Sequence, residues 1–388
     1  MSTTASELTG YLRCDGRVGL RNHVLVLSTV ALTARLATLT AAAMPDAVLV
    51  AGDFPRGLRS PDPELQTRIL DALVAHPNVG GALVLCHDQA AARAMAERLK
   101  NLGKPVEVQA FMSAIGMSDA VQTAQKALLH IAERVSHAQR VPVPLSSLTL
   151  ALECGGSDAT SALAANPAIG RVVDRIIEAG GTAIVSETAE FVGAEAVIRQ
   201  RTECPEMRDA ILEALSRCET ALSEDGESYR GVNPTEENIA AGLTTLIEKS
   251  MGAVSKTGTT PFRGALGFGE APPTAGLWFM DTPFFSPVSV TGMVAAGAQL
   301  TLFAMGVFNP SGNPLAPTVK VCGNPKTISD WADSIDVDVS AAVTRGASLD
   351  EMANRVDIAL RSIASGVQSR AEVWREGQIM IPNSRPLL

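Results

Sequence analysis

Short, uninterrupted apolar segments separated by helical stretches constrain the fold of this chain more than any other feature. In about the first 140 residues these segments are Val24–Thr29, Ala47–Ala51, Gly81–Cys86 and Pro105–Ala110. Strands that are buried on both faces have this composition, and parallel sheets covered by helices are built from such strands. The sequence therefore predicts an α/β fold with a mainly parallel sheet.

The stretches between these segments have helical periodicity. One begins near Ser60-Pro61-Asp62-Pro63 and places Leu65, Ile69, Leu70 and Leu73 on one face. Another extends from about Gln89 to Leu102 and stops at Gly103, a residue typical of helix C-termini. Strand and helix thus alternate in the order expected for a Rossmann-like lobe.

The second half of the chain repeats this alternation after a proline-containing segment, Arg140–Ser147, which we interpret as an extended linker. Strands are expected at Leu148–Leu152 and Thr182–Val185. Helix starts are expected at Asn233-Pro234, Ser286-Pro287, Asn324-Pro325 and Ser348. A chain of 388 residues is long enough for two domains. We therefore expect an N-terminal α/β lobe over residues 1–142, a C-terminal α/β lobe over 143–388, and a cleft between them.

Composition narrows the class of protein. The net charge is −9 and no basic block is present, so we expect no nucleic-acid partner. Six widely spaced cysteines and an N-terminus without a signal-peptide pattern favour a reducing, cytoplasmic location. The longest charge-poor stretch, 282–319, is broken by proline and glycine, so we expect no membrane span. The glycine fingerprint of dinucleotide-binding oxidoreductases is also missing.

Two glycine-containing segments have residues suited to binding an anion. Residues 10–23 hold Arg17, Arg21 and Asn22 in a turn before the first strand, where guanidinium groups could bind a carboxylate. The alternative is a structural turn in which Asp15 pairs with an arginine. Residues 153–158 (ECGGSD) follow a predicted strand and precede a helix, where backbone N–H groups can bind an anion. Here the alternative is a tight connection capped by Ser157 or Asp158.

Charged residues in three further segments could contribute to catalysis. Glu187 and Glu190 share a face if a helix begins there, and paired carboxylates bind metals or transfer protons. Lys249 and Lys256 could act as bases if they are buried, although the pattern alone favours surface lysines. Asp281 ends one apolar strand and Lys320 interrupts another, so the two could be functional or could form a structural pair.

Six segments, taken in order, resemble one family. They begin at Gly10 (GYLRCDGRVGLRNHVLVL), Leu152 (LECGGSDATSALAANPAIG), Gly180 (GGTAIVSETAEFVGAE), Asn233 (NPTEENIAAGLTTLIEKSMGAVSKTGTTP), Gly276 (GLWFMDTP) and Gly312 (GNPLAPTVKVCGNP). They resemble the catalytic part of altronate and galactarate dehydratases. The family that these enzymes form also includes the large subunit of sulfolactate sulfo-lyase. The resemblance implies a lyase that uses a divalent metal and acts on a small anionic hydroxy acid. It also implies a small β-rich domain, which in split members is a separate subunit.

One loop departs from the pattern of the sugar-acid members. Those enzymes have a histidine and a Gly-Cys pair after the second strand, whereas this chain has Gly52–Arg59 (GDFPRGLR). Arg56 and Arg59 indicate an additional anionic group on the substrate. Cys86 and His87, after the third strand, could replace the missing metal ligands.

The resemblance and the residues together predict elimination from a 2-hydroxy acid. A base removes the proton beside the carboxylate, a metal or cationic group stabilises the enediolate, and the β-substituent leaves to give a 2-keto acid. Water is the first leaving group expected and sulfite is the alternative. A third reading is a non-catalytic binding subunit that has lost its metal site.

Roles follow for the individual residues. We expect Arg17, Arg21, Asn22, Arg56, Arg59, Ser157, Asp158, Asn166 and Lys320 to bind or orient substrate, Lys249, Lys256, Cys154 and Glu190 to take part in catalysis, and Cys154, Glu187 and Asp281 to bind the metal. The metal expected first is Fe²⁺, with Mn²⁺ or Mg²⁺ as alternatives. We also expect a homo-oligomer.

Overall fold

The structure is a computed structural model that describes residues 8–223 and 234–385. Contacts divide the chain into two compact units. The N-terminal unit comprises Thr9–Pro142, Pro314–Ala316 and the residues from Gln378 onward. The C-terminal unit comprises Val143–Asn313 and Pro317–Gly377, together with Leu8. Each unit contains its own parallel sheet.

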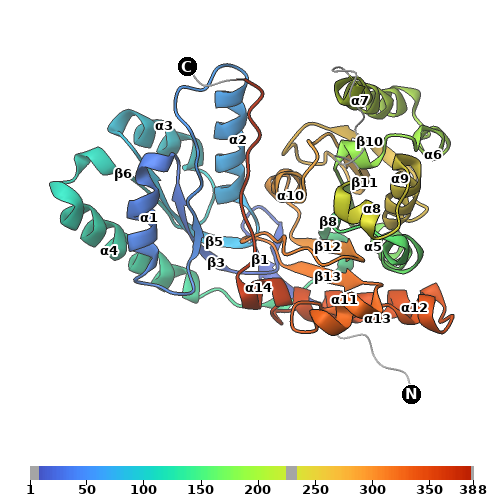
Figure 1. Cartoon of the computed structure of the whole chain (residues 1–388). Helices are drawn as coiled ribbons and strands as arrows, with labels where there is room; N and C mark the ends of the chain where they lie inside the picture. The colour runs from blue at the N-terminus through green and yellow to red at the C-terminus, as the bar shows by residue number, and fades with distance from the viewer. Residues whose placement is uncertain (1–7, 224–233, 386–388) are drawn as a thin grey trace. The chain divides into compact units, whose positions relative to one another are not determined.

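The N-terminal unit is built on a four-stranded parallel sheet in the order β4-β3-β5-β6. These strands are β3 (His23–Ser28), β4 (Val48–Val50), β5 (Val79–Cys86) and β6 (Val106–Ala110). Helices α1 (Ala34–Ala41) and α4 (Gly116–Ser136) cover one face, where Leu36, Leu128 and Ile131 pack against the strands (Figure 1). All four predicted strands are confirmed, and this is the order found in flavodoxin-like sheets.

The helices of the N-terminal unit begin and end where local sequence favours it. Helix α3 (Gln89–Leu99) begins after Asp88, whose side chain accepts a hydrogen bond from the Ala91 N–H at 2.9 Å. It ends three residues before the predicted Leu102. Helix α2 (Asp62–Ala75) buries Ile69, Leu70 and Leu73 as predicted, whereas Leu65 is only partly buried.

The segment that contains Ser384 and Arg385 binds Asp62, the first residue of α2. The Ser384 hydroxyl donates to the Asp62 carboxylate at 2.7 Å, and the Ser384 and Arg385 N–H groups donate to it at 3.0–3.1 Å. Two segments of the N-terminal unit that are more than 300 residues apart are therefore joined by these hydrogen bonds.

A small antiparallel sheet, in the order β2-β1-β7, lies in the segment predicted to be a linker and in the first glycine-containing segment. It consists of β1 (Thr9–Leu12), β2 (Val18–Gly19) and β7 (Val141–Pro142). The linker prediction is wrong for Val141 and Pro142, because these residues pair with Gly10 and Thr9. The prolines do favour an extended backbone there, but the backbone forms sheet hydrogen bonds.

The C-terminal unit contains a seven-stranded parallel sheet in the order β10-β11-β9-β8-β12-β13-β14. Its strands are β8 (Thr149–Cys154), β9 (Thr182–Val185), β10 (Phe262–Leu266), β11 (Gly276–Met280), β12 (Leu300–Met305), β13 (Thr318–Cys322) and β14 (Val337–Asp338). The direction of chain progression reverses at β8, which pairs with β9 on one side and β12 on the other. In open α/β sheets, ligands bind beyond the carboxyl ends of strands at such a reversal.

Helices and short helical turns connect the strands of the C-terminal unit. The helices are α5 (Asn166–Glu178), α6 (Glu195–Arg201), α7 (Pro205–Ser223), α8 (Glu236–Ala240), α9 (Leu246–Val254), α10 (Ser286–Ala295), α11 (Pro325–Asp330), α12 (Ala341–Thr344), α13 (Leu349–Ala364) and α14 (Arg370–Trp374). The turns are η1 (Ala31–Thr33) and η2 (Phe111–Ser113) in the N-terminal unit, and η3 (Leu145–Ser147), the π-helical η4 (Ser161–Ala165), η5 (Thr188–Glu190) and η6 (Ser255–Thr257) in the C-terminal unit. The α/β class with mainly parallel sheets is therefore confirmed.

The predicted helix starts are reproduced with one change. Asn324 caps α11 by accepting from the Lys326 N–H at 2.9 Å, and Ser348 caps α13 by accepting from the Glu351 N–H at 3.1 Å. Thr235 caps α8; the predicted cap, Asn233, lies outside the described residues. Within residues 8–223 and 234–385, no helix combines the length and apolar character needed to cross a membrane.

Candidate active site

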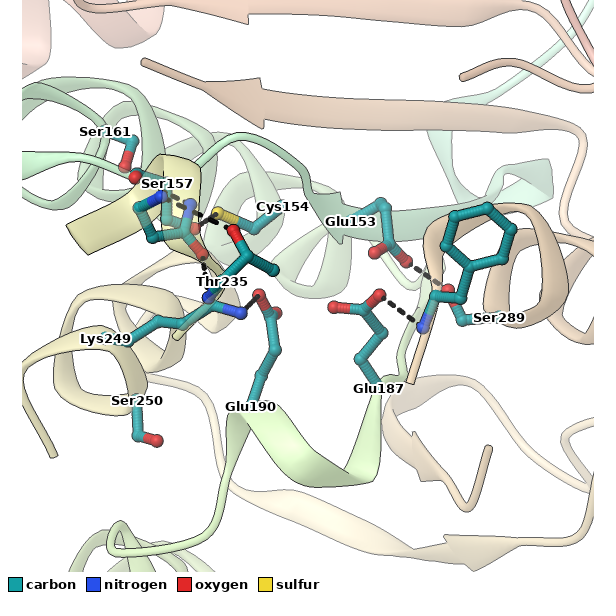
Figure 2. A network of polar contacts seen from close by, with 12 residues as sticks. Glu153, Cys154, Ser157, Ser161, Glu187, Glu190, Thr235, Lys249, Ser250 and Ser289 are labelled. Atoms are coloured by element: carbon teal, nitrogen blue, oxygen red, sulfur yellow. Dashed lines mark hydrogen bonds and ion pairs between the residues drawn. The ribbon is translucent and has the colours of Figure 1, made fainter. Parts of the chain in front are cut away.

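A cluster of buried charged side chains lies beyond the carboxyl ends of β8 and β9. Glu153 belongs to β8. Glu187 directly precedes the η5 turn, and Glu190 is the last residue of that turn. Lys249 lies in α9 and Lys256 lies in η6. All five residues are at most 5% exposed. Figure 2 shows the carboxyl groups of Glu153, Glu187 and Glu190 pointing towards one another, with Lys249 approaching Glu190. We call these five residues the Glu–Lys cluster.

Both lysines of the Glu–Lys cluster contact the carboxyl group of Glu190. Its Oε2 accepts a hydrogen bond from Lys256 Nζ at 2.5 Å, and its Oε1 lies 3.9 Å from Lys249 Nζ. Burial alone would lower the pKa of Lys256, but its charge interaction and hydrogen bond with Glu190 help to outweigh burial and raise that pKa above its ordinary value. Lys256 is therefore held as a cation. The prediction that these lysines are surface residues, which the pattern alone favoured, is wrong.

Glu153 and Glu187 accept hydrogen bonds from neutral donors. Glu153 Oε2 accepts from the Ser289 hydroxyl at 2.7 Å, and Glu187 Oε1 accepts from the Phe285 N–H at 3.2 Å. Burial is the largest influence on the pKa of Glu153, which is about 7; Lys256 lowers it and Glu190 raises it. Burial, followed by the charges of Glu153 and Glu190, raises the pKa of Glu187 well above its usual range. Both carboxyl groups thus resist losing their protons.

The backbone of Glu187 has a conformation that non-glycine residues rarely adopt. Its φ is +63°, in the left-handed region, and it precedes the η5 turn instead of lying in an α-helix as predicted. The Glu187 N–H donates to the Thr282 hydroxyl at 2.9 Å, which fixes this conformation from a distant part of the chain. Such strain costs about 1–3 kcal/mol and occurs most often at functional sites.

Cys154 lies beside the Glu–Lys cluster as a neutral thiol. Its Sγ is 3.2 Å from the Ser157 hydroxyl and accepts from the Asn166 amide at 3.5 Å. Burial and then the charge of Glu190 raise the pKa of Cys154 to about 11, despite the opposing effect of Lys256. Asn166 Oδ1 is buried and, within residues 8–223 and 234–385, has no hydrogen-bond partner. Cys154, Ser157 and Asn166 therefore form one polar wall next to the cluster, and their roles there stay predictions.

The turn after β8 is held by contacts that only glycine permits. Gly156 has a φ of +69°, and a Cβ at this position would lie 2.0 Å from the carbonyl oxygen of Val307. Asp158 accepts from the Ser161 N–H at 2.8 Å and from the Asn324 amide at 2.8 Å. Both carboxylate oxygens of Asp158 thus have structural partners, in agreement with the alternative reading of this residue as a cap. Its role in substrate binding stays a prediction.

Asp281 and Lys320 do not pair with each other. Asp281 accepts from Arg217 at 2.9 Å and from the Thr188 hydroxyl at 2.6 Å, and it lines a cavity of about 470 Å³ with Phe284. Lys320 is fully buried and forms an ion pair with Glu376. The predicted Asp281–Lys320 pair is wrong because α7 and the segment after α14 supply closer partners.

The three predicted metal ligands are not arranged as a ligand set. Across the described ranges, no group of three or more histidine, cysteine, aspartate or glutamate side chains is placed to hold a metal ion. Cys154 contacts Ser157 and Asn166, and Asp281 is bound by Arg217. These residues do not fit the metal that the family resemblance implies, so we assign none of them as a ligand and derive no step through a metal.

The predicted substrate-binding residues of the first lobe all lie in the N-terminal unit. Arg17 forms an ion pair with Asp15 at 2.7 Å, as the structural alternative proposed. Asn22 accepts from Arg13 at 2.9 Å, and Arg21 donates to the Leu20 carbonyl at 2.9 Å. Arg56 and Arg59 are exposed, and Arg56 lies 3.6 Å from Asp88.

Sequence reasoning missed Glu153 and Ser289. Glu153 is a charged residue within an apolar strand, the same signal that drew attention to Lys320. Ser289 gives no such signal, because a serine near a helix start is common. Its contact with Glu153 joins residues 136 positions apart.

Comparisons with known proteins place the chain in a family. The model of the second domain of D-galactarate dehydratase/altronate hydrolase matches residues 10–136. The model of the C-terminal domain of D-galactarate/altronate dehydratase matches residues 145–386. The chain belongs to the D-galactarate/altronate dehydratase family. This confirms the predicted resemblance and places the Glu–Lys cluster within the C-terminal domain of the family.

Individual relatives within the family differ in length. The chain is 31% identical to the (2R)-sulfolactate sulfo-lyase subunit beta of Chromohalobacter salexigens over 96% of both chains. It is also 31% identical to the altronate dehydratase of Bacillus subtilis, over 81% of this chain and 65% of that protein. It is 28% identical to the altronate dehydratase of Escherichia coli, over 94% of this chain and 75% of that protein. The relatives are lyases with different leaving groups.

Proposed function

We propose that the chain is a lyase that eliminates a β-substituent from a small 2-hydroxy acid and yields a 2-keto acid. The observation that carries the proposal is the Glu–Lys cluster, in which three carboxyl groups and two lysines are buried together beyond β8 and β9. Elimination needs one group that removes a proton and another that donates one. The buried lysines and carboxyl groups of the cluster are of the types that remove and donate protons. Family membership supports this reaction class.

The two lysines suit different roles. A base must be neutral before it accepts a proton, and Lys256 is held as a cation by Glu190 at 2.5 Å. Lys249 Nζ lies farther from the same carboxylate, at 3.9 Å, and approaches the three carboxyl groups from α9. We therefore propose Lys249 as the base, and Lys256 as a fixed positive charge that stabilises the enediolate.

Water is the leaving group we propose first, in line with the dehydratases of the family. Sulfite is the second candidate, because the chain covers 96% of a sulfolactate sulfo-lyase subunit beta and is covered by it to the same extent. That relative is named as a subunit, so we also propose that this chain acts with a separate small subunit. Requirement for Fe²⁺, Mn²⁺ or Mg²⁺, and assembly into a homo-oligomer, stay predictions.

The proposed function is tested by an anaerobic screen of hydroxy acids. Purified protein is incubated with sugar acids and other 2-hydroxy acids and with sulfolactate, with and without added Fe²⁺ and a candidate small subunit. Keto-acid formation without sulfite supports dehydration, and keto acid with stoichiometric sulfite supports the second candidate. Tight binding of hydroxy acids with no product under any condition would favour a non-catalytic subunit instead.

A further inference from the structure

The paired carboxyl groups of Glu153 and Glu187 suggest a function beyond the base and the fixed charge. Glu153 is fully buried and Glu187 is 2% exposed. Their hydrogen-bond donors are neutral: the hydroxyls of Ser289 and Ser286 for Glu153, and the Phe285 N–H for Glu187. Glu153 Oε1 is buried and has no hydrogen-bond partner among the residues that the structure describes. Figure 2 shows this carboxyl group directed towards Glu187.

Two adjacent buried carboxyl groups cannot both be ionised without a large cost. Like charges in a medium of low dielectric constant repel strongly, so such pairs hold one proton between them. The cations of the Glu–Lys cluster do not remove this constraint, because Lys256 and Lys249 both face Glu190. The neighbouring Cys154 adds no positive charge. The raised pKa values of Glu153 and Glu187 agree with this picture.

We propose that Glu153 and Glu187 share one proton and donate it to the leaving group of the substrate as the carbon–oxygen bond breaks. This inference rests on the proposed lyase function and assigns a catalytic residue, Glu153, to it. Lys249 takes the C2 proton, and the electron pair left on C2 forms the C2–C3 double bond. The C3 hydroxyl leaves with the shared proton as water. The enol then gains a proton at C3 and loses its hydroxyl proton to solvent.

An acid of this kind discriminates between leaving groups. Hydroxide is a strong base and leaves readily only when it is protonated, whereas sulfite is a weaker base and leaves without help. A shared proton beside the base is therefore needed for dehydration and is dispensable for sulfite release. The Glu153–Glu187 pair favours substrates that lose a hydroxyl group.

Glu153→Gln tests the inference, because glutamine keeps the size of the side chain but cannot donate the shared proton in the same way. Two readouts are compared in D₂O: exchange of the substrate C2 hydrogen, which needs only the base, and keto-acid formation, which needs the acid. We expect exchange within about threefold of wild type and a loss of dehydration of about 10²–10⁴-fold. Glu178→Gln, on the exposed end of α5, is the matched control and should change neither.

Equal loss of exchange and dehydration would overturn the inference, as would dehydration at the wild-type rate. Infrared difference spectra give a readout that does not depend on turnover. A protonated carboxyl band that is present in wild type and shifts or disappears in Glu153→Gln supports the shared proton, and its absence from wild type excludes it. Glu187→Gln should change the same band and serves if Glu153→Gln does not fold. If wild type eliminates nothing, the proposed function fails and the band still decides the shared proton.

Discussion

The Lys256 ammonium group lies 2.5 Å from a carboxylate oxygen of Glu190, and neither side chain is exposed to solvent. The pair joins the η6 turn to the η5 turn across 66 residues of sequence. Buried ion pairs of this kind are weak sources of stability but strong determinants of which charge stays where. In this protein the pair holds Lys256 as a cation inside the Glu–Lys cluster.

The first prediction concerns the stability of this pair. Lys256→Met leaves Glu190 with Lys249 alone at 3.9 Å, so we expect the free energy of unfolding to fall by about 3–5 kcal/mol. Lys256→Met combined with Glu190→Gln removes the uncompensated charge and should recover part of the loss. Urea unfolding followed by circular dichroism measures both. A double variant less stable than the single variant would contradict this account.

The second prediction separates Lys249 from Lys256. Lys249→Met should lower the rate of keto-acid formation by about 10²–10⁴-fold, because it removes the proposed base. Its effect on unfolding should be smaller than that of Lys256→Met, since Glu190 keeps its closer partner. Wild-type kcat in the Lys249 variant would remove this residue from the mechanism.

The third prediction concerns the turn after β8. Gly156→Ala places a Cβ 2.0 Å from the Val307 carbonyl oxygen, in a backbone conformation that already disfavours side chains. We expect a loss of at least about 1–3 kcal/mol in unfolding free energy. Gly297→Ala is the control in the same unit, because Gly297 has a φ of +103° but no atoms within 4 Å of the added Cβ. Equal losses in the two variants would show that contact with Val307 is unimportant.

The fourth prediction is a pH dependence set by Asp336. Burial raises the pKa of this carboxyl group from 3.8 to about 6, even though the N–H groups of Lys320 and Arg370 donate to it. The folded state therefore binds the proton more tightly than the unfolded state, and stability falls as pH rises from about 4 to about 6. Asp336→Asn should remove this contribution to the slope of unfolding free energy against pH. An unchanged slope would refute it.

The fifth prediction concerns the loop that departs from the sugar-acid members. Arg56→Ala and Arg59→Ala should each raise KM for the true substrate while leaving kcat nearly unchanged, if these exposed arginines bind its second anionic group. Arg93→Ala, an exposed arginine on α3, is the control. Steady-state kinetics in which all three variants behave alike would argue against a specific role for the loop.

Local sequence was sufficient to predict much of the fold. The apolar segments that became β3, β5 and β9 are recognisable because parallel strands bury both faces. The starts of α11 and α13 were also predictable, since Asn324 and Ser348 cap the N–H groups three or fewer residues away. These signals depend on neighbours in the chain and not on the tertiary structure.

The chemistry of the site was less predictable because distant contacts determine it. Lys249 is buried by the packing of α9 against η5, which a helical pattern does not reveal. The left-handed conformation of Glu187 depends on Thr282, 95 residues away. Arg217 of α7 donates a hydrogen bond to Asp281, 64 residues away in the sequence. Residue type suggested the candidates, but only the assembled unit shows which of them meet.

The hydrogen bonds between Ser384 and Asp62 have a consequence for synthesis on the ribosome. Helix α2 emerges early, but the hydroxyl and N–H groups that its first residue binds are translated more than 300 residues later. During synthesis Asp62 therefore lacks these contacts until residues 384 and 385 have been added. A gene fragment that stops after Pro142 would encode a protein that lacks the hydrogen bonds between Ser384 and Asp62.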